Sequence, residues 1–147
     1  MNVEFTSKAP LASRALLEDL LFFNPAQGAM TEAIRRSVER FGCPRIVEAA
    51  DGLLIQLGGR DAQALYAFDR DQEDFAPLAV AVYTRTNTEE ISIAHVAVHP
   101  DYCLRSRAAG LGLGVRLIGQ IKQIAARISG IRRIEFSYRE RFVAVPR

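Results

Sequence analysis

The stretch that decides the fold is IAHVAVHP at residues 93–100, followed by RAAGLGLG at residues 107–114. The first part alternates like a strand, and the second is a glycine-rich turn that opens a helix. Glycines let a ligand approach the backbone closely, and the first N–H groups of a helix attract phosphate oxygens. Arg105 and Arg107 stand just upstream, where a guanidinium pairs well with phosphate. The stretch therefore predicts an anion site at the start of this helix.

Two common phosphate-binding loops are excluded by the residues themselves. A dinucleotide-binding fingerprint needs a third glycine at position 115, which is Val115, and an earlier β-α-β pair. A Walker A loop needs Gly-Lys followed by Ser or Thr, and the sequence has no such run.

The segments around this stretch set the topology. Residues 110–128 have helical periodicity, and residues 131–138 follow as a strand. Strand 91–98, the helix and strand 131–138 thus form a right-handed crossover with the two strands parallel. Residues 78–85 and 91–98, joined by a short turn, predict an antiparallel pair. The expected fold class is α/β (α+β), a mixed and mostly antiparallel sheet with one parallel β-α-β crossover.

The rest of the chain predicts further elements, and all of them belong to one domain covering residues 1–147. They are helices over 11–23 and 27–41, a hairpin turning at Ala50-Asp51-Gly52, a strand over 64–68 and, at the other end of the chain, a short strand over 142–145.

Composition and charge narrow the function classes. The 147 residues are 49% hydrophobic and 24% charged, with no apolar run approaching the length of a membrane span. Residues 1–100 carry a net charge of −5 and residues 101–147 a net charge of +7, which favours an anionic ligand near the C-terminal segment. The N-terminus lacks the pattern of a signal peptide. With only Cys43 and Cys103, no metal site or disulfide framework is expected, and a reduced, cytoplasmic location fits.

Taken together, these motifs resemble the GNAT family of acyl-CoA-dependent N-acyltransferases. Val98-His99-Pro100 resembles the family's strand end, and residues 107–112 resemble its pyrophosphate loop. The resemblance implies acetyl-CoA or another acyl-CoA as substrate and a small amine as acceptor. It implies that the strand meets the pantetheine arm, that an N–H near Val96 meets the oxyanion, and that the turn cradles the pyrophosphate. The implied coenzyme contacts are Val96, Ala97, Val98, Arg105, Arg107, Ala108, Ala109, Gly110, Leu111 and Gly112.

The sequence departs from the family pattern in three ways. The spacing from Pro100 to Arg107 is longer than usual. The carboxylate often found on the strand is replaced by Ala94, which leaves its neighbour His95, with an ordinary pKa near 6.5, as the candidate base. Glu89 and Glu90 are expected in an exposed turn. The sequence also stops before the family's usual last helix and strands, so Tyr138 is the candidate acid.

A short C-terminal region leaves one edge of strand 131–138 without its usual neighbour. We expect either the hairpin around residues 50–52 or a second copy of the chain to cover this edge, and prefer a homodimer.

Two other functions compete with catalysis. A non-catalytic GNAT-like module would bind an acyl-CoA or a protein partner, in keeping with Ala94 and the short C-terminus. Nucleic-acid binding would use Arg132, Arg133, Arg139 and Arg141 with the interleaved Phe136 and Tyr138. These residues alternate across a strand whose apolar members belong to the core, so nucleic acid is the least favoured partner.

Overall fold

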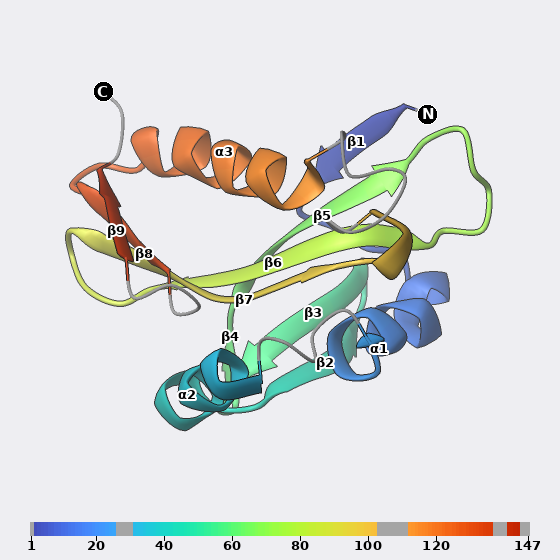
Figure 1. Ribbon diagram of the computed structural model, residues 1–147, viewed down its shortest axis with the longest axis horizontal. Helices are drawn as coiled ribbons and strands as arrows, with labels where there is room; N and C mark the ends of the chain where they lie inside the picture. The colour runs from blue at the N-terminus through green and yellow to red at the C-terminus, as the bar shows by residue number, and fades with distance from the viewer. Residues whose placement is uncertain (1, 26–30, 103–111, 137–140, 145–147) are drawn as a thin grey trace.

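The computed structural model describes residues 2–25, 31–102, 112–136 and 141–144. A six-stranded sheet in the order β1-β5-β6-β7-β8-β9 forms its centre, and helix α3 lies along one face (Figure 1). Helices α1 and α2 and a three-stranded sheet, β2-β3-β4, lie on the other face. The strands are β1 Val3–Thr6, β2 Pro44–Ala49, β3 Gly52–Leu57, β4 Arg60–Asp61, β5 Gln63–Asp69, β6 Pro77–Arg85, β7 Glu90–Val98, β8 Arg133–Phe136 and β9 Arg141–Ala144. The helices are η1 Leu11–Ser13, α1 Arg14–Phe22, α2 Thr31–Phe41, η3 Pro100–Tyr102 and α3 Leu113–Ala126.

The predicted crossover is present. Strand β7 pairs with β8 in parallel, from Glu90 opposite Arg133 to Ile93 opposite Phe136, and α3 makes the connection. Every other strand pair among the described residues is antiparallel, including β6 with β7. The structure therefore confirms an α+β fold with a mixed, mostly antiparallel sheet.

The two faces of the large sheet have separate cores. Helix α3 buries Leu113, Leu117, Ile121 and Ala125, which recur every four residues and so share one face of the helix. The opposite core contains Leu17 of α1 and Tyr66 of β5. Each fully buried leucine or isoleucine side chain contributes about 1.5–3 kcal/mol, so both faces hold the sheet in place.

The three-stranded sheet corrects one expectation. The hairpin of β2 and β3 turns at residues 50–52 as predicted, but it packs below the large sheet and does not reach β8. Strand β9 covers β8 instead, with Ala144 opposite Arg133 and Arg141 opposite Phe136. The expected exposed edge of β8 is therefore closed by the chain's own last described strand.

Other sequence expectations hold with changed bounds. The described parts of the predicted helices are α1, α2 and α3, and strand 64–68 is part of β5. Strand β1 was not expected; it pairs with β5 at the sheet edge.

No described helix is long and apolar enough to cross a membrane. The described residues contain no cluster of histidine, cysteine and carboxylate side chains that could hold a metal ion.

Candidate active site

Strand β7 loses one of its two neighbours at Ala94 while it stays paired with β6. In the pairing with β6, His95 lies opposite Val82 and Ile93 opposite Tyr83, so Ala94 is an extra residue that forms a β-bulge. The parallel pairing with β8 stops at Ile93, one residue earlier. From Ala94 to Val98, no strand in the described part of the chain pairs with the β8-side edge of β7. The bulge and the end of pairing together open the sheet at this point.

Side chains from the helical layer reach this open edge. Ser37 Oγ of α2 donates to the Ala94 carbonyl at 2.5 Å, and Asn24 Nδ2, which follows α1, donates to the Val98 carbonyl at 2.8 Å. On the other edge, the N–H of His99 donates to the Leu78 carbonyl of the β6 strand. Since backbone groups alternate along a strand, Ala94 and Val98 turn their carbonyls away from β6. Two main-chain acceptors of the open edge are thus held by the protein itself.

The N-terminus of α3 lies beside the far end of this edge. A Cβ built on Gly114 would stand 3.6 Å from Val98 Cγ2, an ordinary contact. Gly112 is the N-cap of α3, with a φ of 53° and open space where a side chain would be. The first-turn N–H groups of a helix lack intrahelical acceptors and attract anions. The helix start at which the sequence predicts an anion site therefore lies beside the carboxyl end of β7.

The predicted coenzyme contacts divide into two groups. Val96, Ala97 and Val98 lie on the open half of β7, after its pairing with β8 ends. Val96 and Val98 are partly buried against the α3 core, and Ala97 is buried in the core below α1. Gly112 lies at the start of α3. The remaining predicted contacts and Tyr138 lie outside the described residues; these contacts are Arg105, Arg107, Ala108, Ala109, Gly110 and Leu111.

His95 is buried, with 4% of its surface exposed. It shares a sheet face with Val82, its partner on β6, and this face belongs to the core below α1 and α2. Burial penalises the charged imidazolium and lowers the pKa of His95 to about 4. The ordinary pKa expected from the sequence is therefore wrong, and at neutral pH the imidazole is uncharged. Its catalytic role stays a prediction.

Two carboxylates near the bulge were missed as site candidates: Glu90 is buried and Glu135 is partly buried. Glu90 is 6% exposed, which contradicts the expected exposed turn, whereas Glu89 is partly exposed. Glu90 pairs with Arg133 Nε at 3.0 Å and accepts from Thr86 Oγ1 at 3.2 Å. Glu135 of β8 forms an ion pair with Arg40 of α2. The alternation of polar residues at 90 and 92 could have indicated a polar face at the start of the strand.

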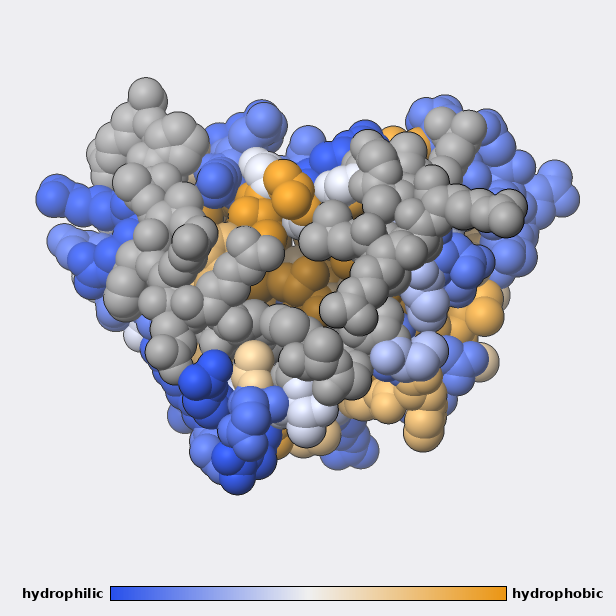
Figure 2. Space-filling model, viewed as in Figure 1, coloured by the Kyte–Doolittle hydropathy of each residue, from blue (hydrophilic) through white to orange (hydrophobic). Residues whose placement is uncertain are grey.

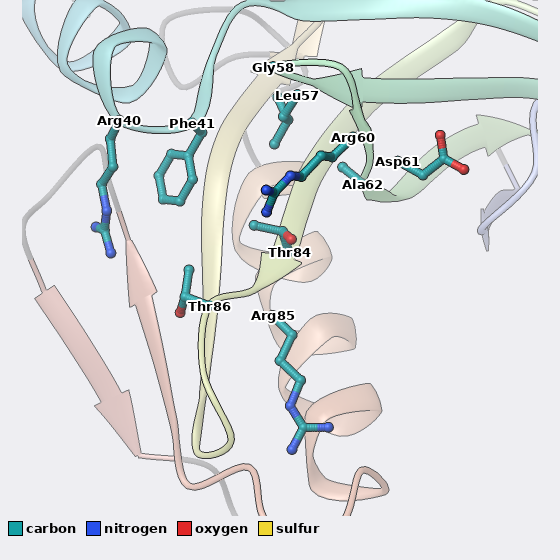
Figure 3. Close-up of a pocket in the computed structure, with 10 residues that line it drawn as sticks. All are labelled: Arg40, Phe41, Leu57, Gly58, Arg60, Asp61, Ala62, Thr84, Arg85 and Thr86. Atoms are coloured by element: carbon teal, nitrogen blue, oxygen red, sulfur yellow. The ribbon is translucent and has the colours of Figure 1, made fainter.

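A cavity of about 510 Å³ lies next to these carboxylates, between the end of α2, the β3–β4 hairpin and the end of β6 (Figure 3). The residues that line it are Arg40, Phe41, Leu57, Gly58, Arg60, Asp61, Ala62, Thr84, Arg85 and Thr86. Its volume is in the range of about 300–1,000 Å³ typical of small-molecule sites. Apolar residues also gather in a hollow at the centre of the face in Figure 2, between hydrophilic flanks.

Comparisons with known proteins find similarity in structure. No family model matches the chain, and no curated protein sequence matches it. One similar structure is a candidate acetyltransferase of the GNAT family from Desulfovibrio desulfuricans, 17% identical with a TM-score of 0.46. That match covers 91% of this chain and 72% of the other. A second is nourseothricin acetyltransferase, 14% identical with a TM-score of 0.45, covering 92% of this chain and 73% of the other. The chain is similar to GNAT acetyltransferases in fold.

Proposed function

We propose that this protein is an acyl-CoA-dependent N-acyltransferase that moves an acetyl group to a small amine. The observation that carries the proposal is the end of the pairing between β7 and β8 at Ile93. Its first half pairs with β8, its second half is open after the bulge at Ala94, and α3 begins beside Val98 at its end. An open strand edge followed by a helix N-terminus offers main-chain groups for an amide-bearing arm and N–H groups for phosphates.

The proposed arrangement follows the strand. The pyrophosphate sits at the start of α3, where Gly112 leaves the backbone accessible. The pantetheine arm runs along β7 from Val98 towards Val96, and the thioester lies near the bulge. Acetyl-CoA would be the acyl donor there, with the coenzyme A thiolate as the leaving group.

The reaction needs few protein groups. The amine nitrogen attacks the thioester carbon, the new C–N bond forms, and the C–S bond breaks. An N–H near Val96 stabilises the oxyanion. The nitrogen loses one proton and the thiolate gains one, with His95 and Tyr138 as the proposed acceptor and donor. Because the pKa of His95 is lowered to about 4, it is a weak base, so the amine has to arrive uncharged.

The alternative is a non-catalytic module that binds an acyl-CoA or a protein. The bonds from Ser37 and Asn24 to the open edge favour the protein-binding form of this module, since they occupy carbonyls that a bound pantetheine arm would also use. An acyl-CoA-binding module would use the same edge as the enzyme and differ from it only in turnover, whereas a protein-binding module would need no acyl-CoA.

Two measurements test the proposal. Acetyl-CoA at a hundredfold excess over its Kd stabilises the fold by about 2.7 kcal/mol, which a thermal shift detects. The double variant Arg107→Ala, Gly112→Val should lose this shift. Release of the free thiol from acetyl-CoA is then measured with a panel of amines. An enzyme should release thiol with at least one amine, whereas a non-catalytic module should release none. Absence of any shift at millimolar acetyl-CoA would refute the enzyme and the acyl-CoA-binding module, and would leave only a module that binds a protein.

The homodimer and the cytoplasmic location expected from the sequence also stay proposals. The exposed edge of β8 that motivated the dimer is covered by β9, so a dimer would have to use another surface. Sedimentation over a wide concentration range tests it, and a strict monomer would count against it.

A further inference from the structure

The cavity of Figure 3 adjoins the bulge of β7. On α2, Ser37 bonds to Ala94, and Arg40 and Phe41 line the cavity one helical turn later. On the sheet, Thr84 lines the cavity and lies opposite Ser92, two residues before Ala94. Partners in an antiparallel pair have Cβ atoms about 4.5–5.5 Å apart. A molecule in this cavity is therefore within reach of a thioester held at the bulge.

Most charged groups around the cavity are already engaged. Arg40 pairs with Glu135 and lies 4.7 Å from the centre of the Phe41 ring. Arg85 donates to the backbone carbonyls of Asn87, Thr88 and Ser129, and its guanidinium points away from the other labelled residues in Figure 3. Asp61 accepts from Gln56 at 3.0 Å. Arg40 therefore has a charged partner, and Arg85 and Asp61 point away from the enclosed space in Figure 3.

The exception is Arg60. Among the residues that the structure describes, it has no ion pair or hydrogen-bond partner for its guanidinium. Figure 3 shows this side chain extending between Phe41 and Thr84, into the space that the labelled residues enclose. A guanidinium presents a planar set of N–H donors that fits a carboxylate through two parallel bonds. The Thr84 hydroxyl lies on the same side of the cavity as an additional donor.

The position of Arg60 is fixed by a glycine contact. Arg60 lies opposite Leu57 in the β3–β4 hairpin, whose tip is Gly58-Gly59. The hairpin presses on Gly42 at the end of α2 so closely that a Cβ on Gly42 would overlap the backbone of Gly58. Both glycines have positive φ, 92° and 57°. This contact holds the Arg60 backbone against the end of the helix that reaches the bulge.

We propose that the cavity is the acceptor site and that it selects amines carrying a carboxylate, with Arg60 as the counter-ion and Thr84 as a second donor. The inference rests on the proposed function, because it places the amine near a thioester at Ala94. It adds the class of acceptor, an amino acid in the broad sense. A single unpaired guanidinium matches the single negative charge of a carboxylate.

The test measures binding as well as turnover. Calorimetry titrates 4-aminobutyrate, and separately propylamine, into the protein saturated with coenzyme A. These probes differ only in the carboxylate. The variants are Arg60→Gln, Thr84→Val and, as a charge-matched control on the opposite side of the sheet, Arg127→Gln. Thiol release from acetyl-CoA is recorded for the same pair of amines.

We expect 4-aminobutyrate to bind at least about tenfold more tightly than propylamine, since hydrogen bonds to charged groups contribute that much or more. Arg60→Gln should abolish the difference, Thr84→Val should reduce it, and Arg127→Gln should keep it. Equal binding of the two amines to the wild-type protein would overturn the proposal, as would a difference that survives Arg60→Gln. If acetyl-CoA gives no thermal shift while 4-aminobutyrate still binds through Arg60, the proposed function fails but the carboxylate site stands.

Discussion

Ser37 donates its hydroxyl hydrogen to the carbonyl of Ala94 at 2.5 Å, at the residue where β7 bulges and leaves β8. Both residues are buried, with exposed fractions of 1% and 0%. The bond therefore ties helix α2 to the point where the sheet opens.

Replacing Ser37 by alanine should destabilise the protein by about 1–3 kcal/mol, because the Ala94 carbonyl loses its partner in a place where water does not reach. Urea denaturation measures the change. The control is Ser7→Ala, an exposed serine outside the described elements, which should change the free energy of unfolding by less than about 0.5 kcal/mol. Equal stability of Ser37→Ala and wild type would mean that this bond contributes nothing.

The titration of His95 predicts a pH dependence of stability. Its pKa is about 4 in the folded protein and near 6.5 in the unfolded chain, so the unfolded state binds more protons between these values. Stability should be full above pH 6.5 and fall as the pH drops towards 4, by about 2 kcal/mol between pH 7 and pH 5. His95→Gln should remove this part of the slope.

The matched control for that experiment is His99→Gln, since His99 is the more exposed of the two histidines. This variant keeps His95 and should keep the slope. Denaturant midpoints at several pH values measure it. An identical slope in the wild type and in His95→Gln would show that burial does not hold the imidazole neutral.

Much of the fold could be predicted because its signals are local. The alternation at residues 91–98, the helical period after Gly110 and the strand after Gly130 fix one crossover, and handedness rules complete it. The separate sheet of β2, β3 and β4 was not predictable in this way. A hairpin pattern identifies its two strands, but the sheet to which they belong depends on packing far along the chain.

The candidate site shows the same limit. The sequence could single out Val96 and Val98 as candidate coenzyme contacts, because a strand end before a glycine turn is a local motif. In the structure both lie on the open half of β7. Glu90 is buried and pairs with Arg133, which is 43 residues away and whose register the sequence does not show. The sequence alone gives Arg60 no role, and the fit of Gly58 against Gly42 makes it part of a cavity wall.

The glycine contact gives a third stability prediction. Gly42→Ala adds both backbone strain at a φ of 92° and an overlap with the backbone of Gly58. Gly59 has a φ of 81° but no atom within 4 Å of an added Cβ, so Gly59→Ala adds strain alone. Gly59→Ala should cost about 1–2 kcal/mol and Gly42→Ala clearly more. Thermal and urea unfolding compare them, and similar losses would show that the hairpin tip yields without cost.

Asn24 and an acyl-CoA compete for one oxygen in the proposed complex. Asn24 Nδ2 holds the Val98 carbonyl at 2.8 Å, and the pantetheine arm would donate to the same edge. If binding has to displace the amide, Asn24→Ala removes the competitor, and acetyl-CoA should bind about threefold to tenfold more tightly. The same variant should lose about 1 kcal/mol of folding stability, since a native hydrogen bond is gone. Calorimetry with acetyl-CoA and urea unfolding measure the two effects separately. Weaker binding by Asn24→Ala would instead show that the amide supports the bound arm, and unchanged binding would place the arm away from Val98.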